Sequence, residues 1–239
     1  MTASPVTTAG CWAWERGTLW ERELTGGHIP AAAPAVAVRW EETGPASGEE
    51  LASAMRLPGS GEVLRRMAGG ARAFAGRVGP PEGPIVCYGW VSAGSGCSPP
   101  YIGELERAFR LRPGEAYVWD CGTAPEHRRL GLYTALLTHI ARTLQAEGFA
   151  RIWIGSALQN RPSIRGFQAA GFRPVLRAAY LRAGALTLFA TRPFPRVPHD
   201  RAAAARAALV REGEHGVGPL SIGRLRPGPE LRWCPEADP

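Results

Sequence analysis

Residues 115–148 read EAYVWDCGTAPEHRRLGLYTALLTHIARTLQAEG, and this stretch decides the fold. Residues 117–121 are β-branched and aromatic, which is typical of a buried strand. Pro125 has no amide hydrogen to give to a strand ladder, so the strand should end before it. An apolar residue then recurs every fourth position and predicts an amphipathic helix, which Gly148 should end. These apolar positions are Leu132, Leu136, Ile140 and Leu144.

The turn between this strand and this helix reads RRLGLY, residues 128–133. Gly131 allows a ligand to approach the backbone closely, and the first amides of a helix have no partner within the helix. Together with the helix dipole, these amides predict an anion site suited to a phosphate or a pyrophosphate. The alternative is an ordinary strand–turn–helix with an exposed basic corner, because a single glycine pattern is weak support.

Two motifs in the right order and separation are far more specific than either one alone. Residues 123–133 follow T-x-P-x-x-R-x-x-G-x-Y, which resembles the acyl-CoA motif V-x-P-x-x-R/Q-x-x-G-x-G/A of the GNAT superfamily of N-acetyltransferases. After a second expected strand, residues 151–156, residues 160–172 resemble that family's N-x-x-A/S-x-x-x-Y-x-x-x-G-F segment. The resemblance covers residues 84–192. It implies an α/β fold with a mixed, mostly antiparallel central sheet, splayed central strands and flanking helices.

The resemblance also implies the reaction and its co-substrate. Acetyl-CoA, or another acyl-CoA, would give its acyl group to a primary amine by direct attack, with no metal. Main-chain groups of residues 121–123 would pair with the pantetheine arm, and amides of residues 129–133 would hold the pyrophosphate. Asn160 would lie beside the arm, although a helix N-cap is the alternative role for this residue. The implied cofactor-binding set is Cys121, Gly122, Thr123, Arg128, Arg129, Leu130, Gly131, Leu132, Tyr133, Asn160, Ser163 and Phe167.

A general base is expected because an alkyl ammonium with a pKa of about 10 must lose a proton before it attacks. By the resemblance, Glu115, eight residues before Thr123, is the first catalytic candidate. Asp120, inside the expected strand, is the second. Glu104 and Glu106 could reach the site from the preceding segment. The alternative for Glu115 is an exposed acid at the entry of a strand.

Three residues depart from the family pattern. Phe167 stands where the family often has a tyrosine that acts as general acid, so Cys121 or Tyr180 would have to protonate the leaving thiolate, unless it leaves unprotonated. Tyr133 stands where Gly or Ala is commoner, so its side chain should point away from the phosphates. Arg129 replaces another frequent glycine. Phe167 and the lack of an unambiguous base keep open a second function, a catalytically silent regulatory module that binds acyl-CoA.

Composition restricts the remaining possibilities. A hydrophobic content of 45% indicates a soluble globular protein, and the net charge of +7 favours an anionic ligand such as CoA. Because the arginines are spread along the chain, nucleic acid is not an expected partner. The five cysteines show no C-x-x-C spacing, which argues against a disulfide framework or a zinc site. No apolar run or signal pattern indicates a membrane, so we expect a cytoplasmic protein, with a homodimer left open.

The outer segments complete the expected organisation. We expect residues 1–33, with Trp12, Trp14 and Trp20, to be an extension packed on an acyltransferase domain of residues 34–195. Residues 196–239 would form a C-terminal extension with a helix at 200–212. Strands are expected at residues 36–40, 71–78, 84–93, 173–180 and 185–191, with a helix at 62–67 and another after a capping box at Ser47.

Trp90, Trp119 and Trp153 fall on three expected central strands. The general burial of large aromatic residues favours a place in the core. The alternative is an aromatic-lined pocket for the acceptor.

Overall fold

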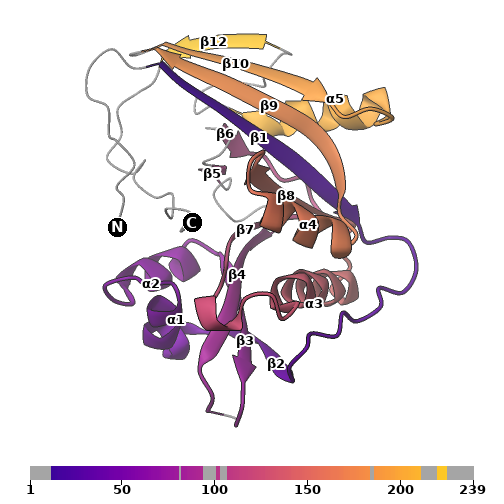
Figure 1. The fold of residues 1–239 in the computed structure, drawn as a ribbon. Coiled ribbons are helices and arrows are strands. Elements are labelled where there is room, and N and C mark those ends of the chain that lie inside the picture. The colour runs from indigo at the N-terminus through magenta and orange to yellow at the C-terminus, as the bar shows by residue number, and fades with distance from the viewer. Residues whose placement is uncertain are drawn as a thin grey trace.

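A large mixed sheet organises the computed structural model, which describes residues 12–80, 82–93, 101–102, 107–183, 186–210 and 220–224 (Figure 1). In the described residues the strand order is β12-β10-β9-β1-β8-β7-β4-β3-β2. The β7–β8 pair is parallel, and the other described pairs are antiparallel. The expected mixed, mostly antiparallel sheet is therefore confirmed. Its strands are β1 (Trp12–Glu23), β2 (Val38–Thr43), β3 (Arg72–Val78), β4 (Ile85–Ala93), β7 (Glu115–Thr123), β8 (Arg151–Ala157), β9 (Arg173–Ala183), β10 (Leu186–Pro193) and β12 (Leu220–Arg224).

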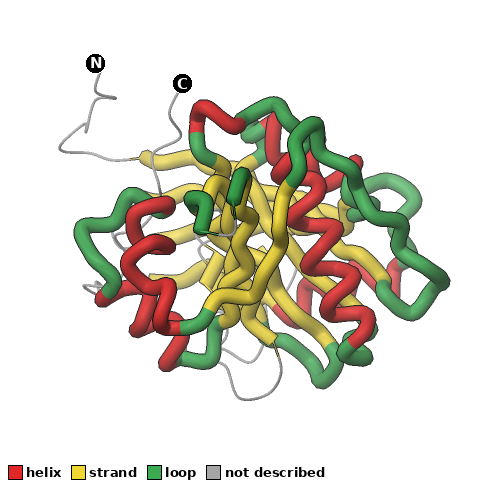
Figure 2. The backbone as a smooth tube through the Cα atoms, turned by 90° about the horizontal axis from the view of Figure 1, so that it is seen from below, coloured by secondary structure: helices red, strands yellow, loops and turns green. Residues whose placement is uncertain are grey.

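Helices cover both faces of this sheet (Figure 2). On β3, Phe74 packs with the long helix α3, whereas its neighbours Ala73 and Ala75 pack with the short helices α1 and α2. Successive side chains of a strand point to opposite faces, so these helices lie on opposite sides. The helices are α1 (Gly48–Ala54), α2 (Gly61–Ala68), α3 (Leu132–Ala146), α4 (Arg161–Ala169) and α5 (His199–Ala208).

A smaller sheet and helix α5 cover the C-terminal half of the large sheet. Strands β5 (Tyr101–Ile102), β6 (Arg107–Phe109) and β11 (Leu209–Val210) pair in the order β11-β6-β5. Ala202 and Ala205 of α5 pack in one apolar cluster with Phe109 and Phe189. The expected helix at 200–212 ends early because residues 209 and 210 pair with β6 as a strand.

Strand β1 corrects our expectation for the N-terminal segment. We expected the first strand at residues 36–40, which overlaps β2, but Trp12–Glu23 forms an earlier strand between β8 and β9 and is antiparallel to both. Its charged residues find partners far away in the sequence: Glu21 is 2% exposed and lies 2.8 Å from Arg201 Nη1. The proposed domain boundaries stay a prediction, and this pairing argues for including residue 12 in the domain.

The sequence correctly predicts the end of α3 but not the cap of α1. Gly148 has a φ of 85° just after α3, the left-handed conformation that ends many helices. The capping box expected at Ser47 is wrong, because this side chain makes no capping hydrogen bond. Ser47 already ends a short 3₁₀ turn, Pro45–Ser47, so its backbone does not have the extended conformation that a capping side chain needs.

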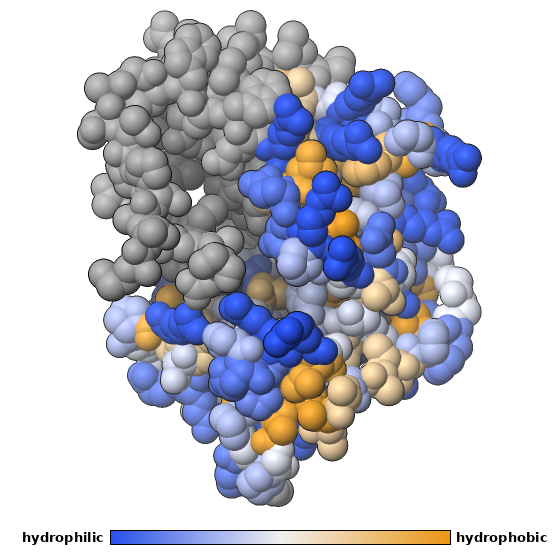
Figure 3. All heavy atoms as spheres, viewed as in Figure 1, coloured by the Kyte–Doolittle hydropathy of each residue, from blue (hydrophilic) through white to orange (hydrophobic). Residues whose placement is uncertain are grey.

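The described surface is mixed in polarity. On the face shown in Figure 3, hydrophilic and apolar residues are interspersed. Leu64, 41% exposed, is the exposed large hydrophobic residue in the described part of the chain. Among the described helices, none has the length and apolar character needed to span a membrane.

Candidate active site

The central strands β7 and β8 part halfway along their length. Their parallel pairing runs from Glu115 opposite Arg151 to Val118 opposite Ile154 and then stops. Strand β8 continues along β1, while β7 continues along β4, so the two halves of the sheet diverge (Figure 1). The expected splay is confirmed. It leaves one side of residues 119–123 without a strand partner in the described structure, and we call this side the open edge.

A β-bulge lies within the open edge. Between the pairs Trp90–Trp119 and Tyr88–Gly122, strand β7 advances three residues while β4 advances two. Asp120, inside this interval, has a φ of 43°, which is the left-handed region that side chains other than glycine seldom adopt. We call residues 119–122 the β7 bulge.

The turn that follows the open edge contains main-chain amides that have no main-chain hydrogen-bond partner among the described residues. Arg129 has a φ of 65° and Gly131 a φ of 78°, and α3 begins at Leu132 without a side-chain cap. No main-chain carbonyl of the described residues accepts a hydrogen bond from the amides of residues 129–132. We call these four residues the amide turn. Exposed Arg128 and Arg129 add positive charge there, and Arg128 Nε donates to the carbonyl of Thr123 at 3.3 Å.

The preceding chain fixes the amide turn from outside. The amide of Ala35 donates to the carbonyl of Leu130 at 2.9 Å. The segment before β2 therefore crosses the start of α3 and holds the turn. Along the chain, the amide turn begins six positions after Thr123, the end of the open edge.

Two aromatic side chains fill the space between α3 and α4. The Tyr133 ring lies against Gly166, where an added Cβ would come within 2.5 Å of it. Phe167 is 1% exposed, and its ring centroid lies 5.8 Å from Trp20 and 6.2 Å from Phe172. Phe167 is a core residue here, and its contact with the pantetheine arm stays a prediction.

Asn160 caps helix α4. Its Oδ1 accepts a hydrogen bond from the amide of Ser163 at 3.3 Å, so the N-cap role considered from sequence is confirmed. Its place beside the pantetheine arm, and the ligand role of the Ser163 hydroxyl, stay predictions.

The two candidate bases lie in different places. Glu115 is 7% exposed, accepts a hydrogen bond from the amide of Arg112 at 3.1 Å and lies 3.4 Å from Arg151 Nη1. The alternative of an exposed acid is therefore wrong. Glu115 lies five positions before Asp120 along the strand, about 17 Å at the usual rise. The structure does not bring Glu115 to the open edge or to the amide turn.

Asp120, in contrast, lies in the bulge itself. Its side chain is 7% exposed and forms an ion pair with Arg66 of α2. Burial raises the pKa of the Asp120 carboxyl, even though Arg66 opposes the shift. Glu104 and Glu106 fall outside the described residues.

Of the two candidate proton donors, Cys121 is the one whose side chain the structure describes. The Cys121 thiol donates a weak hydrogen bond to the Trp119 carbonyl at 3.6 Å and lies against Gly89 and Leu136, beneath α3. Burial raises its pKa well above the ordinary value. The side chain of Tyr180 lies outside the described structure.

Sequence reasoning missed Arg66 and Tyr88. A Cβ added to Gly122 would come within 2.5 Å of the Tyr88 ring, so this ring covers the bulge on one face. The available signals were weak: Arg66 follows Glu62 at helical i,i+4 spacing, and Tyr88 falls in the expected β4. Trp90 and Trp153, at 0% and 1% exposure, are core residues as the general burial of large aromatics predicts.

Known proteins resemble the part of the chain that carries this site. The model of the acetyltransferase (GNAT) family matches residues 89–172. A phosphinothricin N-acetyltransferase of Streptomyces viridochromogenes is 40% identical over 75 residues, which cover 29% of this chain and 41% of that protein.

Solved structures share the fold at low identity. The GCN5-related glucosamine N-acetyltransferase region of a fungal multi-domain β-N-acetylglucosaminidase superposes with a TM-score of 0.54 and 13% identity, over 71% of this chain and 21% of that one. A GCN5-related N-acetyltransferase from Sphaerobacter thermophilus gives a TM-score of 0.48 and 15% identity, over 71% of this chain and 51% of that one. Our chain thus spans less than half of the enzyme from Streptomyces and about a fifth of the fungal protein. Residues 89–172 thus match the GNAT family of acetyltransferases in sequence.

Proposed function

We propose that this protein transfers an acetyl group from acetyl-CoA to a primary amine. The observation that carries the proposal is the open edge of β7, which leads directly into the amide turn. The pantetheine arm has amide groups that can pair with a free strand edge, and a pyrophosphate fits unpaired amides at a helix N-terminus. The two features follow one another in the order in which the arm and the phosphates follow one another in CoA.

The acyl transfer requires few chemical groups from the protein. A neutral amine held against the thioester attacks it directly, so positioning supplies much of the rate. Among the predicted bases we favour Asp120 over Glu115, because Asp120 lies in the bulge and burial raises its pKa towards the range useful for a base. Glu115 remains the second candidate. A thiol with a pKa of about 8.5 is a tolerable leaving group, so no protein acid is required.

A pair of variants tests which of the two candidate bases accepts the proton. If Asp120 accepts the proton, Asp120→Asn should lower the rate about a hundredfold at neutral pH and much less at high pH, whereas Glu115→Gln should keep most of the activity. The reverse pattern would assign the role to Glu115. Acetyl-CoA affinity, measured by calorimetry on the same samples, separates loss of the base from loss of binding.

A second function remains, a regulatory module that binds acyl-CoA without turnover. Phe167 supports it, because this buried ring offers no proton to the leaving thiolate. The experiment is release of CoA from acetyl-CoA, followed with a thiol-reactive dye, across a panel of primary amines that begins with phosphinothricin. Amine-dependent release supports the transferase. Tight CoA binding without release for any amine supports the module, and absence of CoA binding defeats both.

We further propose that the protein works in the cytoplasm. Cys87 and Cys121 are free thiols, which is usual in a reducing compartment. Burial raises the pKa of Cys87 to about 12, so this thiol has little tendency to react. Fractionation of cells that express the full-length protein would test this location.

A further inference from the structure

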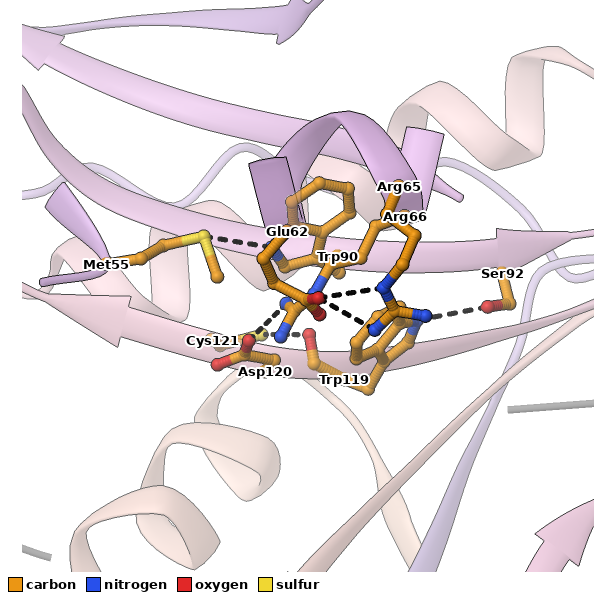
Figure 4. A network of polar contacts seen from close by, with 9 residues as sticks. All are labelled: Met55, Glu62, Arg65, Arg66, Trp90, Ser92, Trp119, Asp120 and Cys121. Carbon is orange, nitrogen blue, oxygen red and sulfur yellow. Dashed lines mark hydrogen bonds and ion pairs between the residues drawn. The ribbon is translucent and has the colours of Figure 1, made fainter. Parts of the chain in front are cut away.

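The guanidinium of Arg66 lies against two neighbouring tryptophan rings on the face of the sheet that α1 and α2 cover (Figure 4). Its Cζ is 5.1 Å from the ring centroid of Trp90 and 4.8 Å from that of Trp119. The rings are themselves held: the Trp119 indole donates to Ser92 Oγ at 3.0 Å, and the Trp90 indole donates to Met55 Sδ at 3.4 Å. Arg66 therefore packs on a fixed aromatic surface.

Two carboxylates fix the remaining edges of the same guanidinium. Nε of Arg66 lies 2.8 Å from Oε1 of Glu62, one turn earlier on α2, and Nη1 forms an ion pair with Oδ2 of Asp120. The Arg66 and Asp120 side chains are 6% and 7% exposed, so solvent screens this pair weakly. The guanidinium connects a helix to the middle of the β7 bulge.

Asp120, the residue that pairs with Arg66, has an unusual backbone conformation. Asp120 has a φ of 43°, a left-handed conformation that costs about 1–2 kcal/mol for most residues and that aspartate adopts more readily than most. The next residues along the chain, 121–123, are those whose main-chain groups form the open edge. A change in the Asp120 backbone would turn the amides and carbonyls of these residues.

We propose that Arg66 is a positioning residue, which holds Asp120 in the left-handed conformation and so sets the open edge for the pantetheine arm. The identity of the ligand rests on the proposed function; the restraint of the bulge does not. Arg66 itself need not touch CoA, since it acts through Asp120.

The first test compares two ligands, CoA and its nucleotide half, 3′-phospho-ADP, which has no pantetheine arm. Arg66→Met keeps a long side chain against the two rings but removes the charge and the hydrogen bonds. It should weaken CoA binding at least about tenfold, while 3′-phospho-ADP affinity stays within about twofold, both by calorimetry. Arg66→Lys, which retains the charge, should recover part of the CoA affinity. Equal losses for both ligands would overturn the proposal, because they would indicate general damage to the fold.

Two control variants test whether this loss of CoA affinity is specific to the bulge. Arg72 on β3 also bridges two carboxylates, those of Glu42 and Glu147, at 2.6 Å each, but lies away from the bulge. Arg72→Met should therefore change neither affinity. Gly131→Asp, in the amide turn, should weaken both ligands.

A double variant separates geometry from charge. Arg66→Met leaves the Asp120 carboxylate buried without its guanidinium, which could disturb the site for that reason alone. Arg66→Met combined with Asp120→Asn removes the charge as well. CoA affinity should stay low, because the asparagine also lacks the restraint; full recovery would overturn the proposal.

Amide hydrogen exchange tests the restraint without any ligand. In the free protein, Arg66→Met should speed exchange in residues 117–123 at least about tenfold, with little change in α3. Arg72→Met provides the comparison. Unchanged exchange in β7 would overturn the proposal whether or not CoA binds, and absence of CoA binding with faster exchange would count against the proposed function alone.

Discussion

Replacing Gly131 by aspartate places a negative charge in the amide turn. Gly131 has a φ of 78°, and an added Cβ would lie 3.6 Å from Cα of Pro34, an ordinary contact. The side chain therefore fits, and its cost to the fold is the left-handed backbone, about 1 kcal/mol. Asparagine has the same shape and tolerates this conformation equally well. Gly131→Asn is thus a matched control that differs from Gly131→Asp by one charge.

The size of the effect follows from Coulomb's law. At about 5 Å in a solvent-like dielectric, two unit charges repel by about 0.8 kcal/mol. Gly131 is exposed, so this dielectric is the appropriate one. A pyrophosphate carries two charges, which gives about 1.7 kcal/mol, or a loss of at least about tenfold in CoA affinity relative to Gly131→Asn.

Titration calorimetry of CoA at two salt concentrations measures this difference. At about 1 M salt the Debye length falls to about 3 Å, so the gap between the two variants should shrink strongly. Equal affinities of folded Gly131→Asp and Gly131→Asn at low salt would refute the anion site. A gap that did not depend on salt would point to shape rather than charge.

Three further predictions concern stability. Phe167→Tyr should lower the melting temperature by about 2–10 °C, because the new hydroxyl would be buried without a partner; an unchanged melting temperature would show that a partner exists. Gly122→Ala should cost about 1–3 kcal/mol in denaturant unfolding, since the added Cβ meets the Tyr88 ring, and Tyr88→Leu in the same chain should recover most of it. Burial, with Arg142 nearby, lowers the pKa of His139, so the folded state resists its protonation and loses stability as pH falls below about 6.5. The melting temperature of His139→Gln should therefore fall less than that of the wild type between pH 7.5 and pH 5, and parallel curves would contradict this.

The amide turn was predictable because its determinants are local. Pro125 ends the strand, Gly131 provides a left-handed turn, and a regular apolar spacing starts the helix, all within the quoted stretch. The N-cap role of Asn160 was predictable for the same reason, since its partner Ser163 lies three residues away. Backbone preferences and hydrogen bonds over a few residues suffice for such features.

The contact between Arg66 and Asp120 was not predictable because it is non-local. Arg66 and Asp120 lie 54 positions apart, and their contact depends on how α2 packs over β4 and β7. Asp120 was named as a candidate base only from its place in the strand. Neither its left-handed backbone nor its buried partner leaves a signal in the residues around it.

Strand β1, which we did not expect from the sequence, packs against Phe167, the residue that departs from the family pattern. Strand β1 brings Trp20, 3% exposed, into the core, where its ring packs edge-on against Phe167 at 5.8 Å. A tyrosine hydroxyl at position 167 would enter this apolar contact, so a strand inserted between β8 and β9 disfavours the residue that the family often has there. In sequence, β1 reads as charged and irregular because Glu21 takes its ion-pair partners, Arg151 and Arg201, from distant elements. The phenylalanine thus has a packing role in the core, whichever of the two proposed functions holds.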